Sequence, residues 1–160
     1  SSDIFENYKK YYEHIDRENM SVTHFLQTVK KNNLILDPTL YICIVNGMEW
    51  AARFVKEANE MGVKICAGTD YINDLDRDLP YLFDEMQLYF EKCAFTPQQV
   101  LLSATKTAAE ALGVADKKGT VCKGKIADLI VLKGNPLNDI KELRNPQWVI
   151  KRGKIVKFQQ

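Results

Sequence analysis

Asp70 is the residue of this sequence whose position most strongly suggests chemistry. It follows the stretch GVKICAGT, in which a mainly apolar run, Val63–Cys66, passes through small residues into a carboxylate. A carboxylate at such a place can cap a turn, and it can also take a proton from water or bind a metal ion. The pattern by itself leaves the turn acid and the catalytic base open.

The loop after Asp70 carries further acids. Asp74, Asp76 and Asp78 have the spacing D-x-D-x-D, which resembles the start of a calcium-binding loop. The glycine and the terminal glutamate that such a loop needs are missing from the sequence. We therefore predict a solvated acidic loop, in which Asn73 and Asp74 are candidates for contacting a substrate.

Metal-ligating side chains are scarce. The histidines are His14, in YYEHID, and His24, which stands beside Phe25 on a predicted helix. His14 is a candidate metal ligand, with a surface histidine as the alternative, and His24 is expected to be structural. The four cysteines are far apart and form no C-x-x-C pair, so neither a disulfide framework nor a cysteine zinc cluster is predicted.

The elements around Asp70 are predicted from apolar spacing. A helix is expected from residue 21 to about 32, a buried strand over Leu34–Leu36, a helix over about 47–61 and a strand over 63–68. Strands that are buried on both faces and joined by a helix are typical of a parallel sheet, with the two strands side by side. Asp70 would then lie at the carboxyl edge of that sheet.

Two further helices are predicted, over residues 79–93 and 96–113. The second has the strongest signals, because Thr96 and Gln99 form a capping box and proline occupies the first turn.

Beyond residue 118 the sequence becomes rich in glycine and β-branched residues. The segments 119–137 and 147–158 predict antiparallel β structure, with a hairpin at Arg152-Gly153. Trp50 and Trp148 are expected to pack in the core or between sheets.

Composition sets outer limits on function. The chain has 160 residues, a formal net charge of +1, 46% hydrophobic and 27% charged residues. Such a balance fits a globular domain, or slightly more than one, without the basic footprint of a nucleic-acid-binding protein. No apolar run approaches the roughly 20 residues of a membrane span. The cytoplasm is the default location, and a periplasmic or secreted location would need a signal upstream of Ser1.

The order of several motifs resembles a known family. AGTD ends a predicted strand, DEM lies in the helix after it, and FTPQQVLLSATKTAAEALG, GTVCKGKIADLIVLKGNPLNDI and VIKRGKIV follow. Together they resemble the C-terminal portion of metal-dependent amidohydrolases, in the branch of imidazolonepropionase-like and prolidase-like enzymes. LDPTL is similar to the seventh strand of that family. The resemblance covers roughly Asn32 to Lys157, and its specificity lies in the ordered combination.

The resemblance implies an α/β fold. Residues 1–115 would be the last strand-helix units of a (β/α)8 TIM-type barrel, with 1–20 a loop or helix. Residues 116–160 would be the C-terminal strands of a small composite β-sandwich. Asp70 would lie on the last barrel strand, touch a divalent metal, zinc by expectation, and take the proton from the metal-bound water as general base.

The sequence also departs from the motifs of this family at positions that bind metal or substrate. No His-x-His pair occurs, and Phe83 stands where many relatives have a histidine. A catalytic zinc site needs about three protein ligands, so we expect a complete enzyme that hydrolyses amide-type C–N bonds of a small molecule or peptide. This chain alone is expected to bind no metal, to be inactive, and to associate with itself or with the missing part of the barrel. The alternative is a non-catalytic barrel-derived chain with an assembly or binding role.

Overall fold

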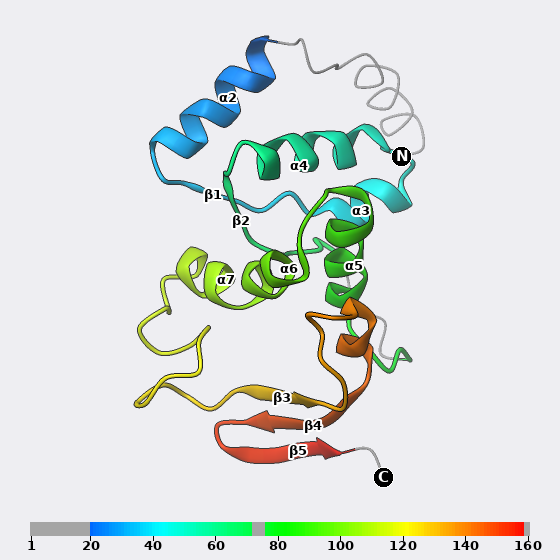
Figure 1. Ribbon diagram of the computed structural model, residues 1–160, viewed down its shortest axis with the longest axis vertical. Coiled ribbons are helices and arrows are strands. Elements are labelled where there is room, and N and C mark those ends of the chain that lie inside the picture. Colours follow the sequence, from blue (N-terminus) through cyan, green and yellow to red (C-terminus); the bar gives the residue numbers. More distant parts are fainter. Residues whose placement is uncertain (1–19, 72–75, 159–160) are drawn as a thin grey trace.

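The structure is a computed structural model that describes residues 20–71 and 76–158. In Figure 1, helices α2 and α4 lie at one end, the two-stranded sheet and helices α5 to α7 in the middle, and a three-stranded sheet at the other end. No described helix is long and apolar enough to cross a membrane. The elements in chain order are α2 (Met20–Lys31), β1 (Ile35–Leu36), α3 (Leu40–Val45), α4 (Trp50–Glu60), β2 (Lys64–Ile65), α5 (Leu82–Lys92), α6 (Pro97–Ala104), α7 (Lys106–Ala111), β3 (Leu129–Leu132), the 3-10 helix η1 (Ile140–Arg144), β4 (Pro146–Lys151) and β5 (Lys154–Phe158).

The strand-helix-strand unit is confirmed, because β1 and β2 pair in parallel with Ile35 opposite Lys64. Its details differ from the prediction in two respects. A short helix, α3, begins at Leu40 directly after β1, where none was predicted. The strands are not buried on both faces, since the residues of β1 are half-buried and Lys64 is exposed. The sheet formed by the described residues has two strands, so side chains at its margins meet water.

The core lies between α2, α4, α5 and the two-stranded sheet. Tyr89 of α5 is fully buried, and its hydroxyl donates to the carbonyl of Cys66, 2.9 Å away, which ties α5 to the end of β2. All four cysteines are free. Burial raises the pKa of Cys66 to about 11 and that of Cys93 to about 12, so both thiols stay neutral. The largest fully buried hydrophobic side chains are those of Leu26, Leu40, Val55, Tyr89, Cys93 and Val100.

The predicted helix over 96–113 is divided in two. Its start is confirmed, with the capping box of Thr96 and Gln99 in place. The break falls at Thr105, whose φ of −124° and ψ of −88° are not helical. The Thr105 hydroxyl donates to the carbonyl of Leu101, at 2.6 Å, a bond that bends helices. The loop at Gly119 packs on the break so closely that a Cβ there would lie 2.9 Å from the Thr105 carbonyl oxygen.

The three-stranded sheet has the order β3-β4-β5 and is antiparallel throughout. The hairpin is confirmed: Arg152 and Gly153 have φ of 50° and 78°, as a turn with two left-handed residues requires. Within the segment predicted as β over 119–137, only Leu129–Leu132 forms a strand. The preceding glycine-rich residues form turns instead.

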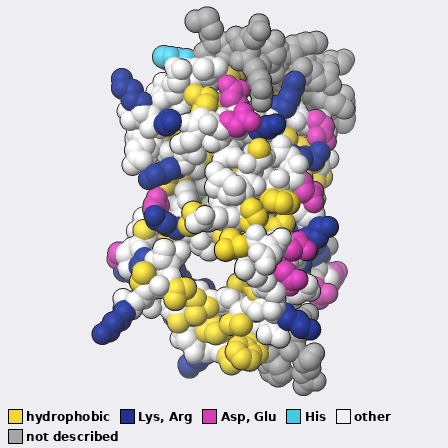
Figure 2. All heavy atoms as spheres, viewed as in Figure 1, with side chains coloured by type: hydrophobic (Ala, Val, Ile, Leu, Met, Phe, Trp, Pro, Cys, Tyr) yellow, Lys and Arg dark blue, Asp and Glu magenta, His cyan; other side chains and the backbone are white. Residues whose placement is uncertain are grey.

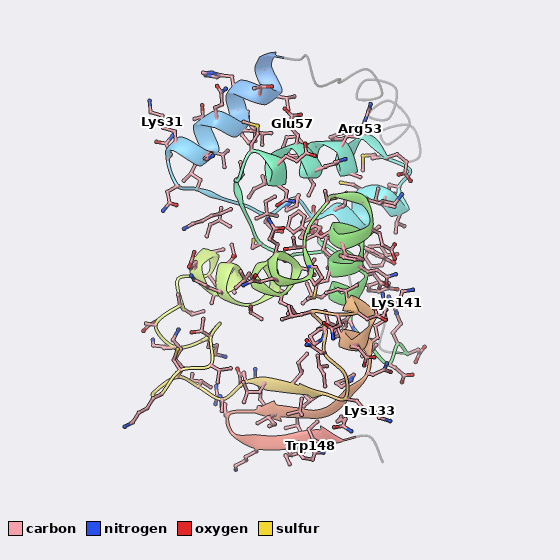
Figure 3. The ribbon with its side chains drawn as sticks, in the orientation of Figure 1. Lys31, Arg53, Glu57, Lys133, Lys141 and Trp148 are labelled. Carbon is pink, nitrogen blue, oxygen red and sulfur yellow. The ribbon has the colours of Figure 1, made fainter. Side chains whose placement is uncertain are left out.

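Apolar side chains on both faces of this sheet are exposed. Trp148 was expected to pack inside, yet it is 46% exposed and lies on β4 at the outer end of the molecule (Figure 3). Figure 2 shows hydrophobic side chains gathered at the same end. Trp148 therefore does not pack in the core of the described residues, and its packing between the sheets of a composite sandwich stays a prediction. The exposed apolar residues of the sheet are Ile130, Trp148, Ile155 and Val156.

Asp128 joins the sheet to the loop before it. Its carboxylate accepts from Lys118 Nζ at 2.6 Å, from Lys151 Nζ at 3.1 Å and from the backbone N–H of Arg152 at 2.9 Å. The hydrogen bond from Lys118, followed by that from Arg152, lowers the pKa of Asp128. The aspartate of the motif GKIADL therefore holds the hairpin turn at Arg152.

Candidate active site at the strand ends

Two carboxylates stand at the carboxyl edge of the parallel sheet. β1 ends at Leu36 and Asp37 follows; β2 ends at Ile65 and Asp70 follows after a short turn. Because parallel strands bring their carboxyl ends to one edge, the two acids are close enough for the charge of Asp70 to act on Asp37. This edge is where barrel and open α/β enzymes place their chemistry.

Asp70 is exposed and has a left-handed backbone, with φ of 46°. The turn around it is held on both sides. The N–H of Ala67 donates to the carbonyl of Ser103 at 3.1 Å, and the N–H of Tyr71 donates to Thr69 Oγ1 at 3.3 Å. Among the described residues Asp70 forms no ion pair, so its carboxylate is available to a ligand.

Asp37 is the residue that the sequence analysis missed. Its carboxylate lies against Gly68, at the end of the neighbouring strand, because a Cβ built on Gly68 would be 2.5 Å from Asp37 Oδ2. Burial raises the pKa of Asp37, and the nearby charge of Asp70 raises it further, while the backbone N–H groups of Thr39 and Gly68 oppose that rise. A signal was present: Asp37 follows the apolar run Leu34–Leu36 much as Asp70 follows its own strand.

Three tyrosines cluster beside Asp70. The ring of Tyr71 lies 4.6 Å from that of Tyr81 and 5.3 Å from that of Tyr41, measured between centroids. The guanidinium carbon of Arg77 lies 3.9 Å above the Tyr81 ring. The cluster therefore packs the residue after Asp70 against the starts of α3 and α5.

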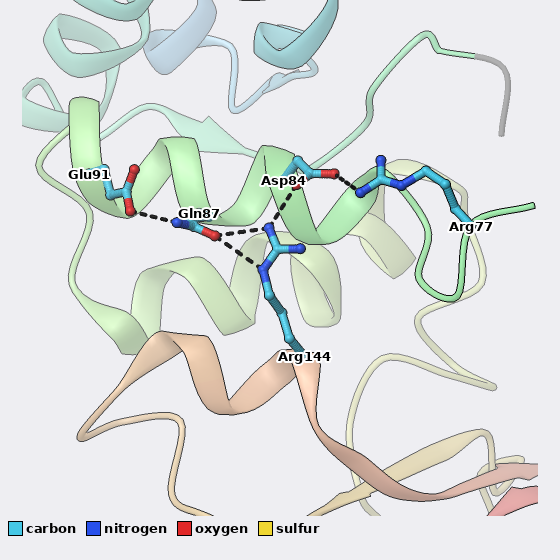
Figure 4. A network of polar contacts seen from close by, with 5 residues as sticks. All are labelled: Arg77, Asp84, Gln87, Glu91 and Arg144. Carbon is cyan, nitrogen blue, oxygen red and sulfur yellow. Dashed lines mark hydrogen bonds and ion pairs between the residues drawn. The ribbon is translucent and has the colours of Figure 1, made fainter. Parts of the chain in front are cut away.

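Asp84 joins the loop before α5 to the C-terminal part of the chain (Figure 4). Arg77 Nη2 lies 3.0 Å from Asp84 Oδ2, and Arg144 Nη2, from η1, lies 2.7 Å from Asp84 Oδ1. Arg144 also donates to the side-chain oxygen of Gln87, at 2.9 and 3.1 Å. We call Arg77, Asp84 and Arg144 the Asp84 clasp.

Glu85, next in the chain, binds the start of helix α3, which follows the carboxyl end of β1. It is fully buried, and its two carboxylate oxygens accept the N–H groups of Leu40, at 2.9 Å, and of Tyr41. These donors are the first residues of α3, so Glu85 caps that helix from another element. Burial raises the pKa of Glu85 to about 7, although the two N–H groups favour the charged form.

The other predicted site residues are not described by the structure. His14 lies before residue 20, and Asn73 and Asp74 lie within 72–75, so their roles stay predictions. Phe83 is half-buried on α5. Within residues 20–71 and 76–158, no three or more His, Cys, Asp or Glu side chains are grouped to hold a metal ion. The exposed carboxylate of Asp70 fits one ligand of a divalent metal.

Comparison with known proteins shows the family of this chain. The model of the amidohydrolase family matches residues 18–156. The chain belongs to the amidohydrolase family. Members of this family generally use divalent metals.

Named amidohydrolases are similar to this chain in sequence. An imidazolonepropionase of Thermoplasma acidophilum is 31% identical over 134 residues, which is 82% of this chain and 32% of that protein. An ochratoxinase of Aspergillus niger is 35% identical over 104 residues, 62% of this chain and 21% of that protein.

Solved structures share the fold of this amidohydrolase chain. A Xaa-Pro dipeptidase with bound methionine in its active site aligns with a TM-score of 0.71 and 27% identity, over 82% of this chain and 36% of the dipeptidase. A prolidase-like protein of Bifidobacterium longum aligns with a TM-score of 0.62 and 30% identity, over 77% of this chain and 35% of that protein. The chain spans about a third of the length of these relatives. The mixed α/β fold and its relation to TIM-barrel-type amidohydrolases are therefore shown over this part.

Proposed function

We propose that the complete protein hydrolyses amide-type C–N bonds of a peptide or cyclic amide, with Asp70 as the general base. The observation that carries the proposal is the place of Asp70: an exposed carboxylate at the carboxyl end of a parallel strand, in a chain of the amidohydrolase family. The bonds that the relatives' names imply support the class of reaction. The particular substrate is left open.

Asp70 has two tasks in this proposal. It contributes one oxygen ligand to a divalent metal, zinc first, and it accepts the proton of the attacking water before passing it to the leaving nitrogen. A divalent metal bound there would lower the pKa of water to about 7, which makes the nucleophile available at neutral pH. His14 is proposed as a further ligand, and Asn73 and Asp74 are proposed as contacts to the substrate.

The chain is proposed to be one part of a larger barrel. Residues 1–115 would supply the last strand-helix units, and residues 116–160 the C-terminal share of a composite β-sandwich. Its length relative to its relatives supports this reading, as do the exposed apolar residues of the β3-β4-β5 sheet. Alone, the chain would be inactive and would associate with itself or with the rest of the barrel.

The test uses the complete protein, its Asp70→Asn variant and a matched control. Hydrolysis is measured on the dipeptides Ala-Pro and Met-Pro and on hydantoin as a cyclic amide, and metal content by atomic emission. We expect Asp70→Asn to lower the rate by about 10²- to 10⁴-fold and to reduce bound metal, with the fold unchanged by circular dichroism. Asp116→Asn removes an exposed carboxylate after α7 and should change neither. An Asp70→Asn protein with the normal rate and metal content, or a complete protein that binds no metal, contradicts the proposal.

A further inference from the structure

Asp37 occupies a position that the proposed chemistry does not use. Its carboxylate lies directly after β1 and contacts Gly68 after β2, and the backbone N–H groups of Thr39 and Gly68 act to lower its pKa. The influence of Thr39 is local, as is typical of aspartate in turns. The contact with Gly68 joins the two strands and reaches the segment that ends in Asp70, two residues further on.

The contact with Gly68 is close enough to dictate the residue type there. A Cβ added to Gly68 would lie 2.5 Å from Asp37 Oδ2, 2.6 Å from Oδ1 and 2.9 Å from Cγ. Atoms do not approach so closely, so any side chain at position 68 would displace the carboxylate. Glycine at this point allows the close approach of Asp37, in contrast to glycines that serve a left-handed turn.

Asp70 stands in a backbone conformation that needs support. Its φ of 46° is left-handed, as is that of Thr39, and such residues persist when their surroundings hold them. The N–H of residue 67 is fixed by Ser103 and the N–H of Tyr71 by Thr69. The close contact of Gly68 with the Asp37 carboxylate lies between these two and links the turn to the neighbouring strand.

We propose that Asp37 is a positioning residue that holds the backbone of residues 68–70 and thereby sets the direction of the Asp70 carboxylate. A carboxylate suits this task because it has two acceptor oxygens and no donor, whereas one side of an asparagine amide would face an N–H group. The catalytic consequence rests on the proposed role of Asp70, while the hold on Gly68 does not. An acid misplaced by about 1 Å can cost about 10²-fold in rate.

The first test is a double-mutant cycle on this chain, with Asp37→Ala, Gly68→Ala and the double variant. Backbone amides 68–71 are followed by NMR shifts and hydrogen exchange. Loss of a hydrogen bond to a charged acceptor should speed exchange at residue 68 by about tenfold or more. Gly68→Ala should shift these amides strongly when Asp37 is present and much less in the Asp37→Ala background. Additive shifts in the cycle, or unchanged exchange in Asp37→Ala, overturn the proposal.

The second test uses the complete protein and the best substrate of the panel above. Asp37→Ala should lower kcat by about 10- to 100-fold with little change in KM, and Asp37→Asn, which keeps one acceptor, should recover part of that loss. If Asp37→Ala does not fold, Asp37→Asn and Gly68→Ala carry the same comparison. A lowered kcat without movement of amides 68–71 would overturn the positioning role. A normal rate in Asp70→Asn would refute the proposed function. The NMR cycle would still test whether Asp37 holds the backbone at Gly68.

Discussion

Replacing Glu85 by glutamine should change how the stability of this protein depends on pH. Glu85 is fully buried, and burial raises its pKa to about 7, from an ordinary value of 4.5. Between these two pH values the folded protein binds more protons than the unfolded chain, so the stability from this group falls as pH rises. The full difference is about 3 kcal/mol, reached near pH 7, since each unit of pKa corresponds to about 1.4 kcal/mol.

Glutamine carries no charge, so the variant lacks this pH-dependent loss. It also has one acceptor oxygen for two N–H groups, those of Leu40 and Tyr41, and losing one of these bonds costs about 1–3 kcal/mol. We therefore expect Glu85→Gln to be the less stable protein at pH 4.5 and to equal or exceed the wild type near pH 7.

Urea unfolding followed by circular dichroism between pH 4.5 and 8 measures the difference. Glu91→Gln is the matched control, because it removes an exposed carboxylate from the same helix, and its difference from the wild type should stay constant with pH. If the difference in unfolding free energy between Glu85→Gln and the wild type also stays constant with pH, the reasoning is refuted. It would mean that the buried carboxyl is ionised throughout this range.

Three further outcomes follow from contacts described above. Asp128→Asn should loosen the β3-β4-β5 sheet, seen as faster amide exchange at the hairpin; the wild type should lose the same support as pH falls below about 4, because the pKa of Asp128 is lowered in the fold. A thiol reagent at pH 8 should modify exposed Cys122 at once, whereas the two buried cysteines should react only on unfolding; fast modification of all three would contradict the burial. Arg144→Ala should lower the free energy of unfolding by about 1–2 kcal/mol because Asp84 loses a charged donor, while Lys141→Ala, exposed on the same 3-10 helix, should change little.

Helices were predictable from the sequence because their signals are local. The capping box at Thr96, the glycine after α4 and the apolar spacing of α2 all act within a few residues, and each is found in the structure. The break at Thr105 was not predictable, since nothing in its neighbours forbids a helix there. It depends on a loop at Gly119 that packs against it from outside the segment.

The site was predictable only in part, for a related reason. Asp70 could be singled out because it follows an apolar run and sits in a family motif. Asp37 follows a similar run, but its contact with Gly68 depends on the pairing of β1 with β2, which no single segment reveals. Glu85 caps α3 from 45 residues away in the sequence, so no local pattern predicts this contact.

The Asp84 clasp makes the middle of this chain and its C-terminal part depend on each other's side chains. A single carboxylate on α5 receives one guanidinium from the loop that follows Asp70 and another from the segment that leads into β4. A chimera that exchanges residues 116–160 for the matching segment of another amidohydrolase would keep this link only if the donor segment brings an arginine to position 144. Domain grafts in this family should therefore be judged by the residue they deliver to Asp84 as well as by the sheet they carry.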